Sequence, residues 1–249
     1  MIPTTLKNAT VIGVFGLAMT PVAMADFTSI DTLGGINAAY LDLDVADFMG
    51  GHQSDNSAVL GGGIGDFPLF ITNQIQTGFG VSGSGSASIS VSLDSPTSVS
   101  TTGAFNGVAN TFGVQGAAQG GAGGGVFFRF TLDTAAQIQM DWLLSDFVNN
   151  NNDDLGGLTL YETNLNGSVL FDVNQDGNGL DMMGSDIFAL DAGQYLLFAS
   201  SEVRVNANEF DGEVLGSAGF DVSFTIIPSP ATLSLVLPSL LIGSRRRRY

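Results

Sequence analysis

An unbroken alternation of apolar and polar side chains near the end of the chain decides the fold: Ala218-Gly219-Phe220-Asp221-Val222-Ser223-Phe224-Thr225-Ile226. Successive side chains of a β-strand point to opposite faces of a sheet, so the five apolar residues at even positions would share one face. The Gly, Asp, Ser and Thr residues between them would lie on the opposite face. The stretch therefore predicts a strand that is buried on one side and solvated on the other.

The same two-residue period recurs along the chain. Alternating stretches lie at 87–93, 126–132 and 138–142, with shorter ones at 41–45, 158–161, 169–171 and 195–199. The best candidate for one short helix is 34–48, although residues 42–45 within it read equally well as a strand. Many short strands separated by turn residues predict an all-β fold, a single antiparallel β-sandwich or jelly roll.

A glycine-rich stretch from Gly116 to Gly125 contains six glycines in ten residues and is predicted to be a flexible internal loop. A boundary between two domains is the alternative. We prefer the internal loop because the preceding residues are poor in the large apolar side chains that a separate core requires.

The chain is strongly acidic. It contains 24 acidic and 7 basic residues, and all of the acidic residues fall between 26 and 227. That range contains only two basic residues, Arg129 and Arg204, and its formal net charge is therefore −22. Such a surface repels nucleic acid and anionic membranes and attracts divalent cations. The sequence has no cysteine, which excludes disulfides, thiolate metal sites and cysteine nucleophiles.

The first 25 residues have the organisation of a secretion signal peptide. Lys7 provides a basic start, residues 9–19 are apolar, and Ala23 and Ala25 supply the small residues required for cleavage before Asp26. A buried helix or a membrane anchor is the alternative. The apolar stretch of 11 residues is too short for a membrane span, which needs about 20.

The last 22 residues combine a proline-rich start, an apolar stretch at 233–242 and four consecutive arginines at 245–248. The arginines would stay on the cytoplasmic side of a membrane that the apolar stretch enters. Residues 231–244 would reach about 21 Å as a helix, which is shorter than a hydrocarbon core of about 30 Å. A short span suits a transient sorting signal better than a permanent anchor, which is the alternative.

This tail resembles the PEP-CTERM sorting signal, whose usual form is Val-Pro-Glu-Pro-Ala-Thr followed by an apolar helix and a basic cluster. Ser229 replaces the usual Glu and Pro238 interrupts the apolar stretch, while the matching residues are Pro228, Pro230, Ala231, Thr232, Arg245, Arg246, Arg247 and Arg248. The stretches 128–132 and 190–195 are similar to a strand and a turn of β-sandwich ectodomains in that family. The resemblance implies processing by an exosortase-type membrane protease, membrane contact through the tail alone, and a destination in the cell envelope or extracellular matrix.

A calcium site is predicted at Asp172-Val173-Asn174-Gln175-Asp176-Gly177-Asn178. Oxygen-bearing side chains fall at relative positions 1, 3, 5 and 7, with glycine at position 6, as in the first half of an EF-hand loop. Position 12 is Met183 instead of a bidentate glutamate, so the loop is not a complete EF-hand. The alternative is that Asp, Asn and Gly serve only as turn residues.

A predicted hairpin would bring further carboxylates to this loop. Residues 158–163 and 168–172 are expected to pair, which places the loop 149–154 beside the loop that follows Asp172. Close carboxylates repel one another unless a cation or protons intervene. The full set of expected calcium ligands is Asp172, Asn174, Asp176, Asn178, Asp153 and Asp154.

Catalytic residues are sparse in this sequence. His52 is the only histidine and no nucleophile motif accompanies it, which is typical of a surface residue. A glycosidase needs two carboxylates about 5 to 9.5 Å apart, and no pair stands out among the acidic residues. Trp142 is the only tryptophan, and its alternating position favours the core over a sugar-stacking surface. The sequence therefore predicts a protein that is not an enzyme.

Three functions fit these observations. The leading hypothesis is a non-enzymatic structural or interaction module of the cell envelope or of an exopolysaccharide matrix. The second is a calcium-dependent carbohydrate-binding module, which the paired Asp and Asn loops favour. The third is a hydrolase of matrix polysaccharide, for which the sequence offers no specific residue pair.

Overall fold

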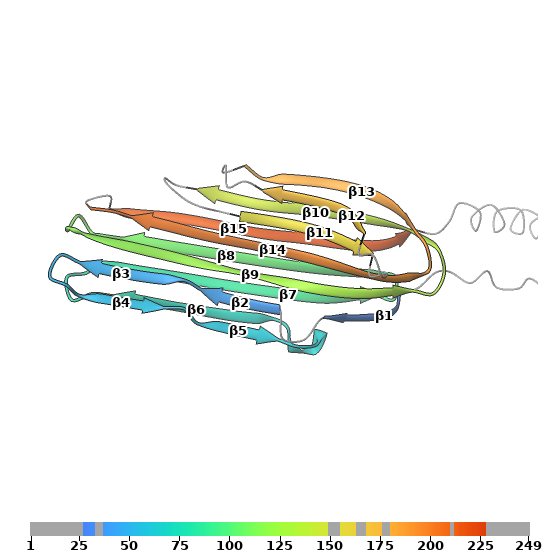
Figure 1. The fold of residues 1–249 in the computed structure, drawn as a ribbon, viewed down its shortest axis with the longest axis horizontal. Coiled ribbons are helices and arrows are strands. Elements are labelled where there is room, and N and C mark those ends of the chain that lie inside the picture. The colour runs from blue at the N-terminus through green and yellow to red at the C-terminus, as the bar shows by residue number, and fades with distance from the viewer. Residues whose placement is uncertain are drawn as a thin grey trace, which may run out of the picture.

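The computed structural model describes residues 27–32, 37–148, 155–162, 168–175, 180–209 and 212–227. The strands form two antiparallel sheets that pack face to face, with the apolar core between them (Figure 1). The predicted all-β class and antiparallel β-sandwich are therefore confirmed.

Sheet A contains nine strands, with the order β12-β11-β14-β9-β2-β5 and with β1, β3 and β4 beside this path. Its strands are β1 (Phe27–Thr32), β2 (Asn37–Leu41), β3 (Leu43–Asp47), β4 (His52–Asp55), β5 (Ala58–Gly61), β9 (Gly116–Leu132), β11 (Leu155–Glu162), β12 (Val169–Gln175) and β14 (Gly193–Ala207). The long strand β9 pairs with β14 along one edge, and with β1, β2 and β3 along the other.

Sheet B contains six strands in the order β13-β10-β15-β8-β7-β6. Its strands are β6 (Leu69–Gln76), β7 (Ser82–Ser95), β8 (Ser98–Asn110), β10 (Ala136–Val148), β13 (Met182–Leu190) and β15 (Glu213–Ile227), and a 3-10 turn (Ile64–Asp66) precedes β6. The alternating stretch 218–226 lies within β15, where its even-numbered residues are buried as predicted.

The stretch 34–48 was the best candidate for a helix, but it forms strands where the structure describes it, and the alternative strand interpretation of 42–45 is confirmed. Residues 37–41 form β2 and residues 43–47 form β3. Ala39, Leu41, Leu43 and Val45 are all buried, so the apolar residues of this segment follow a period of two. Ala and Leu favour helices intrinsically, but pairing with β9 and burial of one face decide the outcome here.

The glycine-rich stretch from Gly116 to Gly125 is not a loop, and that prediction is also wrong. It forms the first ten residues of β9, in the middle of sheet A. A Cβ atom added to Gly120 would lie 2.0 Å from the backbone oxygen of Val108 on the opposite sheet. The sheets meet here backbone to backbone, more closely than the usual spacing of about 10 Å, and only glycine fits.

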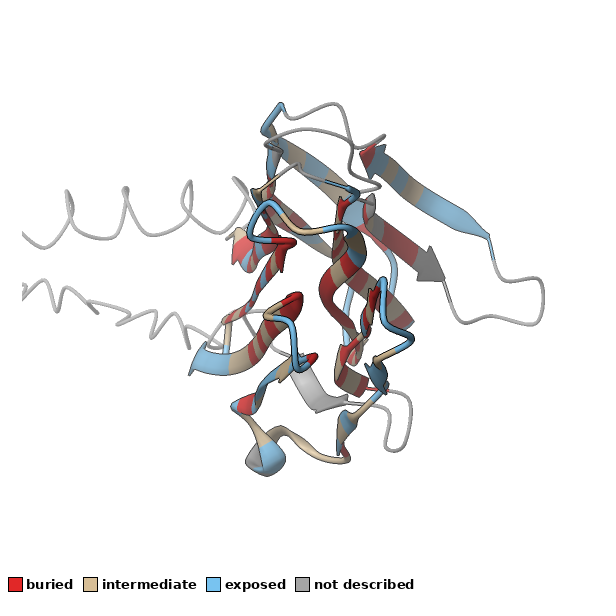
Figure 2. Cartoon of the chain, turned by 90° about the vertical axis from the view of Figure 1, so that its left-hand side faces the viewer, coloured by how far each residue is buried: buried red, intermediate tan, exposed pale blue. Residues whose placement is uncertain are grey.

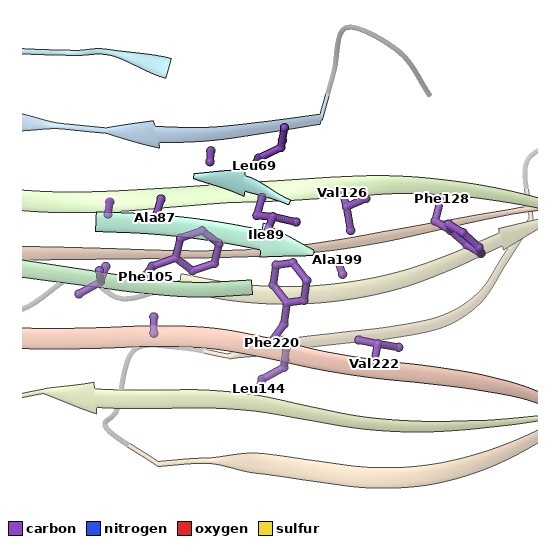
Figure 3. Packing of buried hydrophobic residues seen from close by; sticks show 14 of the residues in the cluster. Leu69, Ala87, Ile89, Phe105, Val126, Phe128, Leu144, Ala199, Phe220 and Val222 are labelled. Carbon is purple, nitrogen blue, oxygen red and sulfur yellow. The ribbon is translucent and has the colours of Figure 1, made fainter. Parts of the chain in front are cut away.

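Large apolar side chains fill the interior beyond this contact (Figure 3). Phe105 of β8 and Phe220 of β15 pack with ring centroids 6.1 Å apart, and Phe130 of β9 contacts Phe224 at 6.0 Å. Burying one such ring contributes about 1.5 to 3 kcal/mol to stability. The buried apolar residues extend from Ala39 to Ile226, so a chain of residues 26–227 retains this entire core.

Two further sequence features have packing roles. Trp142 is half-buried, packs against the core and donates a hydrogen bond from Nε1 to Oδ2 of Asp186 at 3.1 Å. Tyr195 closes the turn at 190–195, because its buried hydroxyl donates to the backbone carbonyl of Asp191 at 2.9 Å. This bond resembles the tyrosine corner of other β-sandwiches.

The predicted signal peptide (1–25) and sorting tail (228–249) lie outside the described residues and stay predictions. Within the ranges that the structure describes, no helix is long and apolar enough to span a membrane.

Candidate functional site

The outward face of sheet A has aromatic side chains where a solvated sheet would present polar ones. Tyr40 on β2, Phe127 on β9 and Phe198 on β14 all occupy outward positions and are half-buried. They border a groove of about 580 Å³ that crosses five neighbouring strands. Its lining also includes Ala38, Gly125, Gly157, Thr159, Asn174, Ser200 and Glu202.

The two phenylalanines form a stacked apolar pair, which we call the aromatic platform. Phe127 and Phe198 are register partners on β9 and β14, and their rings stack with centroids 4.2 Å apart and planes 26° from parallel. Gly125 makes room for this arrangement, because a Cβ atom there would lie 3.1 Å from the Phe198 ring. A stacked pair loses little conformational freedom when a ligand covers it.

Tyr40 lies across β9 and reaches the neighbouring strand. A Cβ atom on Gly123 would lie 2.6 Å from the Tyr40 hydroxyl oxygen, so only glycine lets the phenol occupy this place. Burial raises the pKa of Tyr40, and the negative charge of Glu202 and a hydrogen bond to it raise the pKa further. The hydroxyl therefore stays protonated at neutral pH and donates to Glu202.

A charged network continues the groove beyond Tyr40. Arg204 Nη2 lies 2.9 Å from Asp42 Oδ2 and 3.0 Å from Glu202 Oε1. Gln119 Nε2 donates to the same Asp42 oxygen at 2.8 Å. These side chains come from β9, β14 and the link between β2 and β3, so the network fixes hydrogen-bonding groups beside the aromatic platform.

A second hollow of about 350 Å³ adjoins the network, and Asp42, Gln119 and Arg204 of the network line it. His52 lies in this hollow, with Nε2 2.7 Å from Asp44 Oδ1. The imidazole is largely exposed, as expected for a surface histidine.

One of the predicted calcium ligands lines the groove, and a second lies beside it. Asp172 and Asn174 are exposed on the outward face of β12, and Asn174 lines the groove. Asp172 accepts hydrogen bonds from the Thr159 hydroxyl at 2.8 Å and from the Asn174 amide at 3.2 Å. The predicted pairing of 158–163 with 168–172 is confirmed as the antiparallel pairing of β11 with β12.

The other predicted ligands, Asp153, Asp154, Asp176 and Asn178, lie outside the described residues. Among described residues there is no group of three or more histidine or acidic side chains arranged to hold a metal ion. The calcium site stays a prediction.

Sequence reasoning missed the groove, although a signal was present. In the stretch 126–132, Phe127 occupies a position where the alternation calls for a polar residue, and Phe198 does the same within 195–199. Arg204 stood out as one of two basic residues in an acidic domain. The cross-strand register that brings these residues together was not available from the period alone.

Comparison with known proteins gives no family for the chain. No family model matches it, and no curated protein matches it. It is similar to the enzymatically active domain of bacteriophage CBA120 tailspike protein 4, with 12% identity, a TM-score of 0.25 and coverage of 64% of this chain and 19% of that chain. The protein thus spans about a fifth of the tailspike chain.

Two further likenesses are as distant. A CBM4 structure has 6% identity and a TM-score of 0.19, covering 50% of this chain and 81% of that chain. A structure of infectious bursal disease virus, Gt strain, has 10% identity and a TM-score of 0.21, covering 92% and 91%. Similarity at this level carries no argument about function, so the candidate site rests on its own geometry.

Proposed function

We propose that this protein is a non-enzymatic binding module of the cell envelope or extracellular matrix, and that its groove binds a neutral polysaccharide. The observation that carries the proposal is the stacked pair of Phe127 and Phe198 beside the network of Tyr40, Glu202 and Arg204. A sugar ring has an apolar face that stacks on an aromatic ring and hydroxyl groups that need fixed donors and acceptors. The groove offers both within one continuous surface.

Charge selects the class of polymer. A domain with a formal net charge of −22 repels anionic polysaccharides at long range, whereas a neutral chain can approach freely. Both carboxylates of the network accept hydrogen bonds from, or pair with, Arg204. Hydrolysis of a glycosidic bond would need a carboxylic acid placed to donate a proton, so this arrangement favours binding over cleavage.

The predicted sorting tail supports a cellular location in which the domain could bind polysaccharide. Processing of residues 228–249 by an exosortase-type protease would deliver the domain to the envelope or to an exopolysaccharide matrix, where it would meet polysaccharide. The tail would contact the membrane only while the protein is being sorted.

Calcium dependence is a second candidate property, favoured by the position of Asn174 in the groove wall and of Asp172 beside it. A calcium ion held by these residues with Asp176, Asn178, Asp153 and Asp154 would sit near the bound sugar. Ions of this kind raise the melting temperature of a folded protein that binds them.

Affinity electrophoresis of residues 26–227 in gels containing neutral polysaccharides tests the main proposal. We expect retardation by at least one neutral polysaccharide, and a loss of affinity of about tenfold or more in Phe198→Ala. Phe70→Ala is the matched control, because Phe70 is exposed on sheet B away from the groove. Equal retardation of the wild type and Phe198→Ala would exclude the groove as the binding site.

A thermal melt with added calcium or with chelator tests the second property. A calcium-dependent rise in the melting temperature that disappears in Asp172→Ala with Asp176→Ala would support the ion site. An unchanged melting temperature would leave these residues as strand and turn residues, without affecting the groove.

A further inference from the structure

Three turns at one end of the sandwich gather exposed apolar side chains. They are the β3–β4 turn at 48–51, the β6–β7 turn at 77–81 and the β8–β9 turn at 111–115. Figure 2 looks onto this end and shows its turns largely exposed. We call the surface formed by the following four residues the apolar tip: Phe48 (54% exposed), Met49 (66%), Phe79 (49%) and Phe112 (61%).

The three phenylalanines lie close together, and Met49 follows Phe48 in the same turn. The rings of Phe48 and Phe79 lie with centroids 5.2 Å apart and planes tilted by 53°. Phe112 completes the group, because its Cδ2 atom lies 3.8 Å from the place that a Cβ atom on Gly80 would occupy. Contacts among three separate turns make one shared apolar surface, in contrast to the single exposed apolar residues found on most proteins.

The backbone holds this surface in place. The carboxylate of Asp47 is buried and accepts hydrogen bonds from the backbone N–H groups of Met49 and Gly51, each at 2.9 Å. Phe112 has a φ of 49°, a left-handed conformation that bulky residues adopt at a free-energy cost. The following Gly113 also has a positive φ, so this turn is of a kind that favours Asn at the place of Phe112. A local cost of this sort is typical of a functional position.

The turns contain no charged residue, although the domain carries 24 acidic ones. Acidic side chains lie just beside them: Gln115 Nε2 donates to Glu209 at 3.1 Å, and Asn110 Nδ2 to Glu213 at 3.4 Å. This pattern suits a partner that is apolar at the centre of contact and carries no net negative charge around it.

The size and shape of the tip decide what that partner is. Four partly exposed side chains provide far less than the roughly 1,200 to 2,000 Å² that a stable protein–protein interface buries. The turns project from the narrow end of the sandwich, so a second copy would offer an equally convex surface (Figure 1). A fluid bilayer can surround a projection of this kind and bury aromatic rings about 5 to 10 Å deep at its boundary.

We propose that the apolar tip inserts reversibly into the interface of a zwitterionic lipid bilayer. The tip lies at the end of β9 opposite to Phe27 and Ile227, since Phe27 pairs with Leu132 and Ile227 with Gln137. The 17-residue strand β9 extends about 56 Å between the two ends. Insertion would leave the outward face of sheet A, with its groove, accessible to a polymer. This proposal is independent of the proposed polysaccharide binding.

Flotation of residues 26–227 with vesicles of pure phosphatidylcholine tests the proposal. We expect the wild type to float with the vesicles, and Phe79→Ser with Phe112→Ser to reduce the bound fraction about tenfold or more. Phe70→Ser is the matched control, because Phe70 is 61% exposed, as Phe112 is, but lies away from the tip. Replacing part of the lipid by phosphatidylserine should weaken binding at low salt.

A second variant separates lipid binding from folding. Phe112→Asn relieves the left-handed strain, so it should raise the melting temperature while it lowers vesicle binding. A wild type that stays with the unbound fraction, or tip variants that float as well as the wild type, would overturn the proposal. Concentration-dependent self-association in the absence of vesicles, lost in the tip variants, would instead assign the tip to a second copy and also overturn it.

Discussion

Glycine has a different role on each face of the glycine-rich segment of β9. On the inward face, a Cβ atom on Gly120 would meet the backbone oxygen of Val108 at 2.0 Å. On the outward face, a Cβ atom on Gly123 would meet the phenol of Tyr40, a side chain that can move. Gly120 on the inward face therefore lets the two sheets approach each other, and Gly123 on the outward face makes room for a side chain of the groove.

The rest of β9 makes the comparison sharper. From Val126 onward the inward positions carry large side chains, including Phe128 and Phe130, and the outward position at Phe127 carries the platform. Glycine is thus confined to the part of the strand where neighbouring backbone or an aromatic ring comes closest. The backbone contact at one end and the aromatic core at the other are both needed for the sandwich to close over its full length.

The largest predicted effect is that of Gly120→Ala. The added methyl group would collide with the backbone of β8, which cannot move without disturbing its pairing with β7 and β15. We expect a loss of about 3 kcal/mol or more in the free energy of unfolding, measured by urea denaturation of residues 26–227.

Gly63→Ala is the control for this experiment. A Cβ atom on Gly63 would meet nothing within 4 Å, and its φ of −98° is open to alanine. The stability of this variant should stay within about 0.5 kcal/mol of the wild type. A Gly120→Ala protein as stable as the control would mean that the sheets can separate freely at this point.

An intermediate effect is predicted for Gly123→Ala. The methyl group would displace Tyr40 from its place across β9 and weaken its contact with Glu202. Because the colliding atoms belong to a half-exposed side chain, the stability loss should stay below about 1.5 kcal/mol. Affinity electrophoresis should show polysaccharide binding weakened about tenfold. The contrast between the two faces would fail if this variant lost as much stability as Gly120→Ala.

The strands with a clear alternation of apolar and polar residues were predictable from the sequence, whereas β8, β13, the groove and the use of glycine were not. Phe220, Phe224 and Ile226 follow a strict period of two, which reports burial of one face directly. The run from Gly116 to Gly125 has no apolar period to read, and its composition is shared by flexible loops and by backbone-to-backbone contacts. Only the neighbouring sheet distinguishes the two.

The candidate site could not be predicted from the sequence for a related reason. Tyr40, Phe198 and Glu202 are far apart in the sequence and meet only because β2 and β14 both pair with β9. The register of those pairings depends on contacts along the whole sheet. By contrast, the loop at 172–178 was conspicuous because its spacing is local, yet only Asp172 and Asn174 of its expected ligands fall within the described ranges.

The smallest predicted effect is a pH dependence that reports the outward face alone. Burial and then the charge of Glu202 raise the pKa of Tyr40 above its ordinary value of about 10. Above that pH the unfolded chain loses the proton while the folded protein keeps it, so stability should fall as the pH rises from 10. The contribution is fully present below pH 10. Solvent screening at this half-buried position limits the change to about 0.5 kcal/mol. Urea denaturation between pH 8 and 11 should show a shallower decline in Tyr40→Phe than in the wild type. Identical slopes would mean that the phenol is not held against Glu202. Gly123 would then not be needed to make room for the Tyr40 side chain.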